Sequence, residues 1–463
     1  MAGTTIITGH VRGPRCWRSR IREMKNFLKL LACCALCALC VLLGAAPDLL
    51  AQTSVSRKKI PAAQDPAYAA LQSAQAAMDR KDFEAAVTSY QDYLSQHPDD
   101  AAGHFQLGYA YSALQRPADA RTEYEKAAAL KPDMAEAHLN LGLTLLDTDP
   151  AAAVSPLQKA AELTPDQARP KFLLGWALER SGKLAPAIEQ YQLAEKLDDK
   201  NFEIRFALGR TLLSAEHAAD AEKEFREALV LRPDSAPAHL GLAQSLFAQK
   251  KLEDAAAEYA LYLRSHPNDT PARIERASAL ADIGKDDDAL EELDRATAAQ
   301  PEGIQALKLR SLVYFHKRRY DDAVPVLQKI AALAPRDPDI PARLGHVYLE
   351  KKDYPNAVRE LIVAIKMNPG DTDVLGDLVA AQYLNKNYAA ALQGMDLLSQ
   401  RKPLPLGTWF IRATCYDKLG QPAPALEAYE KFLQLNKDEN NDMYFEASAR
   451  VRFLKRELEN KKR

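Results

Sequence analysis

The stretch DDAAGHFQLGYAYSALQRPADARTEYEKAAALKP, residues 99–132, contains the pattern that decides the fold of this chain. Its landmarks are apolar and small residues at fixed places: Leu107, Gly108, Tyr111, Ala120, Tyr124, Ala127 and the closing Pro132. Apolar residues three or four apart predict helices, and proline ends a helix because it lacks a backbone N–H. The stretch therefore predicts two helices joined by a turn, a unit that cannot bury its own apolar face.

The same pattern recurs along the chain at a constant period. The closing position is occupied by Pro98, Pro132, Pro165, Asp199, Pro233, Pro267, Pro301, Pro335, Pro369, Pro403 and Lys437. Successive closing positions are separated by the same number of residues as Pro98 and Pro132. The one exception is the step from Pro132 to Pro165, which is one residue shorter. An alanine precedes the closing position at the same distance in all eleven repeats, from Ala86 to Ala425. The period predicts eleven tandem units over residues 65–437.

A small and a large residue also recur at fixed distances from each closing position. Ten residues after it stand Gly108, Gly142, Gly175, Gly209, Ala243, Ala277, Ser311, Gly345 and Ala413, with Val379 as the exception, and Ala74 has this role in the first repeat. Eight residues before it stand Tyr90, Tyr124, Leu157, Tyr191, Phe225, Tyr259, Leu293, Leu327, Leu361, Met395 and Tyr429. A large side chain over a small one lets two helices approach closely, and overfilling such a contact costs about 1–3 kcal/mol.

In period and pattern the chain resembles the tetratricopeptide repeat family. The resemblance implies an all-α, right-handed superhelical solenoid of about eleven helix–turn–helix units. In this family the first helices of successive repeats line a concave groove that binds proteins or peptides. We therefore expect a non-enzymatic scaffold for protein–protein interaction.

Two local features of the array can be predicted as well. Aspartates follow several closing prolines and are expected to cap the next helix, namely Asp99, Asp133, Asp166 and Asp234. The third repeat lacks one residue near residues 147–150. We place this deletion in the turn, because a loss within a helix would rotate one of its faces.

Residues 438–463 depart from the repeats and are predicted to form a capping helix with a basic tail. Ala447, Val451, Leu454 and Leu458 lie at helical spacing, and charged residues fill the other faces. Such a helix covers the apolar face of the last repeat, as repeat arrays require. A dimerising coiled coil is the alternative, although the segment has few heptads for it.

Residues 1–51 combine a basic start with an apolar run at residues 30–46, which is the pattern of a secretory signal peptide. With Met24 as a second plausible start and cleavage after Ala51, this predicts an exported protein of bacterial type, periplasmic or secreted. The alternative is an uncleaved anchor in the inner membrane, since about 17 apolar residues are at the lower limit for crossing a bilayer. Residues 52–64 are polar and are expected to form a flexible lead.

Charge and cysteine content exclude two further classes. The net charge of −2 gives no argument for nucleic acid, and the basic cluster at residues 316–320 does not recur in other repeats as phosphate tracking requires. Five of the six cysteines lie in residues 1–51, so only Cys415 remains if this segment is removed. A disulfide framework is therefore not expected.

Known catalytic and metal-binding motifs are absent from the sequence. It has no glycine-rich phosphate loop, HExxH, paired-cysteine motif or Gly-x-Ser-x-Gly elbow. His104, His138 and His239 recur six residues after a closing proline, and we interpret them as packing residues because no supporting carboxylate stands at ligand spacing. Residues 286–288 are acidic but lack the alternating ligands of a calcium loop. We expect no catalysis, cofactor or metal.

The remaining candidate is a binding surface on the first helices of the early repeats. The positions seven and eleven residues after the closing position carry the predicted partner-binding residues Phe105, Tyr109, Phe172, Trp176, Phe206 and Arg210. Later repeats have smaller or more polar residues at these positions, for example Ala342 and Gly376. Aromatic residues with arginine are typical of interface hot spots. The alternative is that the neighbouring repeat covers part of each pair.

Two subtypes of the family do not fit this chain. Chaperone-binding members hold the C-terminal carboxylate of a peptide with a lysine and an asparagine at two groove positions, and no repeat here has that pair. Sugar-transferase members carry a ladder of asparagines, of which only Asn140 is present. Two functional alternatives stay open: a membrane-anchored assembly factor for an envelope or secretion complex, and an enzyme whose site is assembled across repeats.

Overall fold

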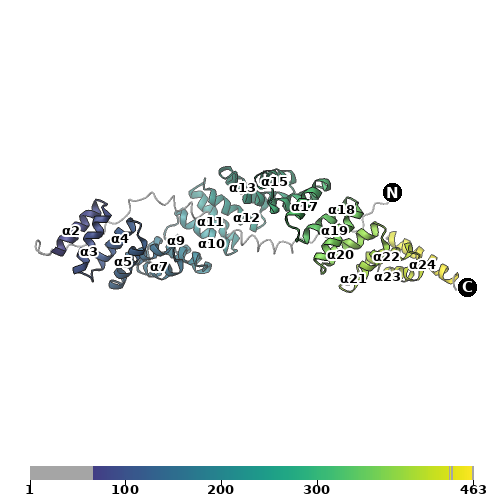
Figure 1. Cartoon of the computed structure of the whole chain (residues 1–463), viewed down its shortest axis with the longest axis horizontal. Coiled ribbons are helices and arrows are strands. Elements are labelled where there is room, and N and C mark those ends of the chain that lie inside the picture. Colours follow the sequence, from purple (N-terminus) through teal and green to yellow (C-terminus); the bar gives the residue numbers. More distant parts are fainter. Residues whose placement is uncertain (1–65, 437, 439–441, 461–463) are drawn as a thin grey trace. The chain divides into compact units, whose positions relative to one another are not determined.

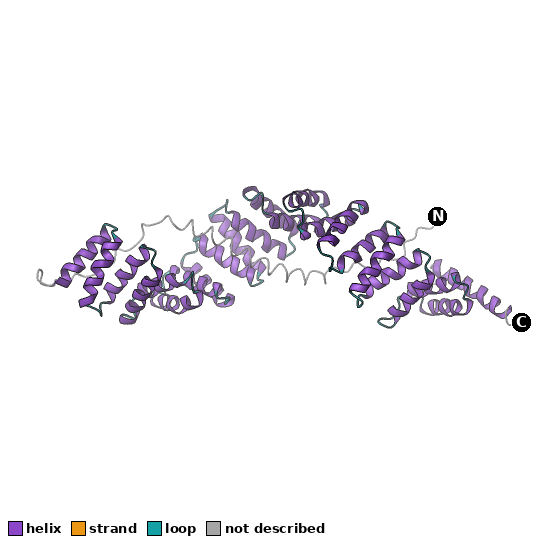
Figure 2. Ribbon diagram, in the orientation of Figure 1, coloured by secondary structure: helices purple, strands orange, loops and turns teal. Residues whose placement is uncertain are grey.

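The computed structural model describes residues 66–436, 438 and 442–460, and all regular structure in this part of the chain is α-helical (Figure 2). The predicted signal or anchor at residues 1–51 and the lead at residues 52–64 lie outside the described residues, as does the closing Lys437. The all-α fold expected from the repeats is confirmed.

The helices alternate between first and second members of a repeat. The first helices are α2 (Pro66–Asp79), α4 (Ala101–Ala113), α6 (Ala135–Leu145), α8 (Ala168–Arg180), α10 (Phe202–Ser214), α12 (Ala236–Ala248), α14 (Thr270–Asp282), α16 (Ile304–His316), α18 (Asp339–Glu350), α20 (Thr372–Leu384) and α22 (Leu406–Lys418). The second helices are α3 (Phe83–Gln96), α5 (Pro117–Leu130), α7 (Pro150–Leu163), α9 (Leu184–Leu197), α11 (Ala218–Leu231), α13 (Leu252–Ser265), α15 (Asp286–Ala299), α17 (Tyr320–Leu333), α19 (Tyr354–Met367), α21 (Tyr388–Ser399) and α23 (Pro422–Leu435). A last helix, α24 (Asp442–Asn460), follows the eleven pairs.

Each helix packs against the helices that precede and follow it in sequence (Figure 1). First helices of successive repeats also touch, for example α8 with α10 and α10 with α12. These helix–helix contacts join elements of the same repeat or of adjacent repeats. Each repeat therefore supplies the surface on which the next one packs.

The predicted pairing of a small with a large residue is present in the packed helices. All eleven recurring alanines are fully buried, and the large side chain that follows each of them one helical turn later is at most 2% exposed. A Cβ atom added at Gly108 would lie 2.9 Å from the Tyr124 ring, and one at Gly345 would lie 2.7 Å from Leu361 Cδ2. Only a small residue fits at these positions.

Val379 breaks the small-residue rule, and the structure supplies the reason. Val379 is buried on α20, and a Cβ atom added at Gly394 of α21 would lie 2.6 Å from its Cγ2 atom. In this repeat the small residue, Gly394, lies on the second helix instead of the first, so the two helices still approach closely.

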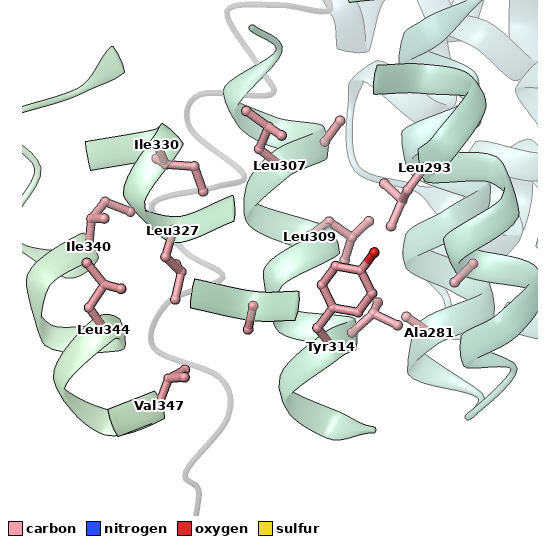
Figure 3. Close-up of a cluster of buried hydrophobic side chains, with 14 of the residues drawn as sticks. Ala281, Leu293, Leu307, Leu309, Tyr314, Leu327, Ile330, Ile340, Leu344 and Val347 are labelled. Atoms are coloured by element: carbon pink, nitrogen blue, oxygen red, sulfur yellow. The ribbon is translucent and has the colours of Figure 1, made fainter. Parts of the chain in front are cut away.

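The buried residues continue from one repeat into the next. Figure 3 shows a part of this core in which Leu327 of α17 lies beside Leu344 and Val347 of α18. On the other side of the same view, Leu309 and Tyr314 of α16 face the preceding pair of helices. Burial thus depends on neighbours on both sides.

The turn within a repeat has a feature that the sequence pattern did not reveal. In ten of the eleven turns the second residue after the first helix has a positive φ: Lys81, Gln115, Gly182, Glu216, Lys250, Gly284, Arg318, Lys352, Lys386 and Gly420. The exception is the shortened third repeat, in which α6 is two residues shorter than α4 and Asp149 has φ −146°. The deletion therefore affects the end of α6 as well as the turn after it.

The predicted helix caps were wrong by one residue. The N-cap is the second residue after the closing position, as at Asp100, whose carboxylate accepts from the backbone N–H of Ala102 at 3.0 Å. At Met134, Gln167 and Ser235 the cap side chain makes no such bond. The aspartate directly after the proline lies one position too early to reach those N–H groups.

Candidate functional site

The six predicted partner-binding residues lie on three first helices, α4, α8 and α10, and all of them are half-buried. Because α8 and α10 contact each other directly, Phe172, Trp176, Phe206 and Arg210 belong to neighbouring surfaces. They are accessible enough to meet a partner and buried enough to be held in place by the repeat.

The three phenylalanines partly rest on the large residue of their own repeat. The ring centroids of Phe105 and Tyr124 are 5.7 Å apart, and the pair of Phe172 and Tyr191 has the same separation. Phe206 meets Phe225 edge-on at 5.9 Å. One part of each phenylalanine therefore stabilises the repeat. The other part remains exposed.

Arg210 already has a partner within the chain. Its Nε and Nη2 atoms donate to the two carboxylate oxygens of Glu179 on α8, at 3.1 and 2.8 Å, and the Tyr191 hydroxyl donates to the same carboxylate at 2.9 Å. Burial disfavours the charge on Arg210, but the Glu179 carboxylate outweighs burial and raises the pKa of the guanidinium. A bound partner would meet this ion pair rather than a free arginine.

The recurring histidines connect a loop to a helix. His104 Nε2 lies 2.9 Å from the carbonyl oxygen of Pro98, and its Nδ1 lies 2.5 Å from a carboxylate oxygen of Glu123. His239 makes the same two contacts, with Pro233 and with Glu258 at 2.6 Å. For His104 and His239 the prediction that no carboxylate supports the ring was therefore wrong, because the carboxylate lies on the second helix of the same repeat. Among the described residues, the His138 ring contacts only the carbonyl oxygen of Pro132, at 3.0 Å.

Other repeats use a lysine or arginine in the place of histidine. Lys171, Arg205 and Arg273 each donate to the carbonyl oxygen of their closing residue, at distances between 2.6 and 2.8 Å. Arg273 also pairs with the buried Glu292, which occupies the place that Glu123 has relative to His104. A basic residue at this position thus ties the loop between repeats to the second helix, which is a structural role. Within the described residues no group of three histidine, cysteine, aspartate or glutamate side chains is placed to hold a metal ion.

The later first helices present a different surface. His346 on α18 lies 3.7 Å from the Asp377 carboxylate on α20, and the ring of Phe315 on α16 meets the imidazole edge-on at 5.2 Å. Burial raises the pKa of Asp377, although the neighbouring His346 opposes this. At Gly376 an added Cβ atom would meet nothing within 4 Å. This surface is more open and more polar than that of α4 and α8.

A half-buried carboxyl, Glu275, lies between repeats six and seven. The hydroxyl of Tyr259 donates to the Glu275 carboxylate at 2.7 Å. Burial raises the pKa of Glu275, and the bond from Tyr259 lowers it less than burial raises it. This hydrogen bond links the second helix of one repeat to the first helix of the next.

The remaining sequence candidates have structural roles. Residues 286–288 form the first turn of α15, where acidic side chains favour the helix N-terminus. Cys415 is buried, which raises the pKa of its thiol to about 12 and makes it unreactive. In the basic cluster, Lys317 pairs with Asp287 at 2.9 Å and Arg319 with Asp322 at 2.7 Å. None of the helices within residues 66–460 that the structure describes combines the length and apolar character needed to span a bilayer, and the apolar run at residues 30–46 lies outside that part.

The family comparison agrees with the repeat pattern. The model described as tetratricopeptide repeat matches residues 71–112, 105–168, 147–202, 206–270 and 274–338, and a second model with the same description matches residues 406–439. Residues 339–405 are matched by neither model, although helices continue there at the same spacing. No curated protein matches this chain in sequence.

Several solved structures resemble parts of the chain. MamA from Desulfovibrio magneticus RS-1 is 24% identical, covers 38% of this chain and 99% of its own, and has a TM-score of 0.35. A tetratricopeptide repeat protein from Parabacteroides merdae is 16% identical and covers 55% of this chain and 98% of its own, with a TM-score of 0.40. YrrB, a TPR protein with an unusual peptide-binding site, is 19% identical and covers 47% and 96%, with a TM-score of 0.34.

Proposed function

Because the chain belongs to the tetratricopeptide repeat family, whose repeats generally serve as protein-interaction scaffolds, we propose that it binds a protein or peptide along the first helices α4, α8 and α10. The partner would lie on Phe105, Tyr109, Phe172, Trp176, Phe206 and Arg210. No catalytic step is part of this proposal.

One observation carries the proposal: the aromatic side chains on these helices keep an exposed part after packing on their own repeat. Phe172 rests on Tyr191 through one part of its ring and stays half-exposed, and Trp176 follows one helical turn later. Preorganised aromatic side chains bind with little further loss of conformational entropy, which is why they dominate interface hot spots. Helices α18 and α20, which have Ala342 and Gly376 at the same positions, lack such side chains, whereas α22 has Phe410 there.

The ion pair of Arg210 and Glu179 suggests how a partner is oriented. It lies beside the aromatic residues, and the arginine side chain is 36% exposed while the glutamate is 15% exposed. A partner carboxylate or backbone carbonyl could use the remaining donors of the guanidinium without breaking the bidentate bond. We therefore favour a partner that combines apolar side chains with an acceptor group.

We place the protein in the cell envelope, exported through the signal at residues 1–51. The alternative is an assembly factor for an envelope or secretion complex, held in the membrane by residues 30–46. N-terminal sequencing of the protein from cells separates these two: a chain that begins at Gln52 supports export with cleavage, whereas a chain that retains residues 30–46 supports the anchor.

Affinity capture from an envelope extract tests the binding surface. The parent chain is compared with the triple variant Phe172→Ala, Trp176→Ala, Arg210→Ala. A matched control is Phe410→Ala, because Phe410 packs on Tyr429 at 5.8 Å as Phe172 packs on Tyr191 but lies on the distant helix α22. We expect the parent and the control to retain the partner and the triple variant to lose it. Equal capture by all three would place binding elsewhere, and circular dichroism checks that each variant is folded.

A further inference from the structure

The last helix, α24, is covered on one face. Ala447, Val451 and Leu454 are buried in a cluster with Tyr429 and Phe432 of α23. Arg450 donates to the Asp417 carboxylate of α22 at 2.6 Å and fixes the helix on the last repeat. This face acts as the predicted cap.

The first helices of complete repeats are covered on two faces. In α4, Gly103, Leu107 and Ala110 have the same spacing as the buried face of α24, and Gly103 lies against the preceding helix α3. Gly108, five residues after Gly103, lies against the ring of Tyr124 on the following helix α5. The corresponding residue of α24, five after Ala447, is the exposed Arg452.

The opposite face of α24 forms an exposed stripe that no other helix of the described chain covers. Its members are spaced at three or four residues and are all exposed: Asp442, Phe445, Glu446, Ala449, Arg452, Phe453 and Arg456. Phe445 is 60% exposed and Phe453 is 54% exposed, and they are the only exposed phenylalanines among the described residues. Two exposed aromatic rings on one helix face are unusual for a surface in contact with water alone.

The order of residues in this stripe makes it complementary to itself. Ala449 lies at its centre, with the acidic residues before it and the basic residues after it. Phe445 and Phe453 are each four residues from Ala449, Glu446 and Arg452 are each three, and Asp442 and Arg456 are each seven. Among the described residues none of these four charged side chains has an ion-pair partner.

We propose that α24 pairs with α24 of a second copy of this chain, antiparallel and around a two-fold axis at Ala449. In this arrangement Phe445 faces Phe453, Glu446 faces Arg452, and Asp442 faces Arg456, each pair occurring twice. The small side chain of Ala449 lets the helices approach at the axis. A parallel pair would instead place like charges opposite each other, so the charge order selects the antiparallel one.

Charge reversal with rescue tests this pairing in the full chain. Sedimentation equilibrium compares the parent with E446R, with R452E and with the double variant E446R/R452E. Each single variant sets like charges against each other twice in the dimer, so we expect its Kd for self-association to rise by about tenfold or more. The double variant restores both attractive pairs and should return to the Kd of the parent.

The controls separate this surface from other routes of association. E125R reverses a charge in the exposed pair of Arg121 and Glu125 on α5 and should leave the Kd unchanged. Association through residues 30–46 or through the repeats would not follow the pattern of loss and rescue. A parent chain that stays monomeric overturns the proposal. This holds as well if the monomer instead sediments with phosphatidylserine vesicles or binds a different protein, because α24 would then have another partner. A double variant that dimerises no better than the single variants overturns it as well.

Discussion

Two glycines in neighbouring repeats provide a direct test of the helix packing. Gly345 lies in α18 and Gly376 in α20, both within a first helix. A Cβ atom at Gly345 would collide with Cγ of Leu361 and lie 2.7 Å from its Cδ2, whereas one at Gly376 would meet nothing within 4 Å. The same substitution by alanine therefore has opposite consequences at the two positions.

The expected magnitudes follow from helix propensity and packing. Alanine is favoured over glycine in a helix interior by roughly 0.5–1 kcal/mol, so Gly376→Ala should raise the free energy of unfolding by about that amount. Gly345→Ala has the same gain, but Leu361 is fully buried and cannot move aside. Overpacking costs about 1–3 kcal/mol, so the two variants should differ in stability by about 1–3 kcal/mol.

Native-state hydrogen exchange is the suitable assay, because long repeat arrays need not unfold in one step. In a repeat array the loss should be felt mainly in α18, α19 and their neighbours. Leu361→Ala removes the clashing atoms, and it should therefore cost less in the Gly345→Ala background than in the parent. Equal protection in both glycine variants, or no coupling between Gly345→Ala and Leu361→Ala, would refute the packing of small against large residues.

Three further perturbations have expected outcomes. Lys352 has φ 60°, so Lys352→Gly should raise the denaturant midpoint by an amount equivalent to about 0.5–1 kcal/mol, and a lower midpoint would contradict the left-handed turn. The pKa of Glu275 is raised in the folded chain, mainly by burial, so ionisation opposes folding and stability should fall as the pH rises above about 4, the ordinary value of a glutamate. Glu275→Gln should remove this fall in urea titrations at several pH values, and an unchanged pH profile would show that Glu275 is not its source. His104→Ala removes one partner of the buried Glu123 and should lower the free energy of unfolding by about 1–3 kcal/mol, whereas zinc should leave the Tm of the parent unchanged. A rise of Tm with zinc would indicate instead that the histidines bind a metal ion.

The outline of the fold could be predicted because its causes are local. A small residue and the large residue that fills it, such as Gly108 and Tyr124, belong to the two helices of one repeat. The same spacing recurs in most units, so the repeats support one another's interpretation. Aromatic residues at the groove positions were visible in the same way, although whether a partner binds them stays a prediction.

The contacts that define the chemistry of the surface could not be predicted from the same pattern. Arg210 and Glu179 belong to different repeats, so nothing in one unit marks them as partners. His104 and Glu123 stand on two helices whose relative rotation is known only after packing. These contacts show that Arg210 is paired within the chain, and that His104 and His239 link a loop to a helix rather than acting as packing residues alone.

The sequence by itself determined the period, the helix–turn–helix unit and its small and large packing residues. It also determined the order of charged residues along the last helix. All of these depend on residues that lie within one repeat or within a few helical turns. The tertiary structure alone decided which side chains stay exposed once the repeats are packed. It showed that Val379 is accommodated by Gly394, that most turns use a left-handed residue, and that one face of α24 is left uncovered. Exposure and ion pairing depend on how neighbouring helices are rotated against each other, and a one-dimensional pattern does not contain that rotation.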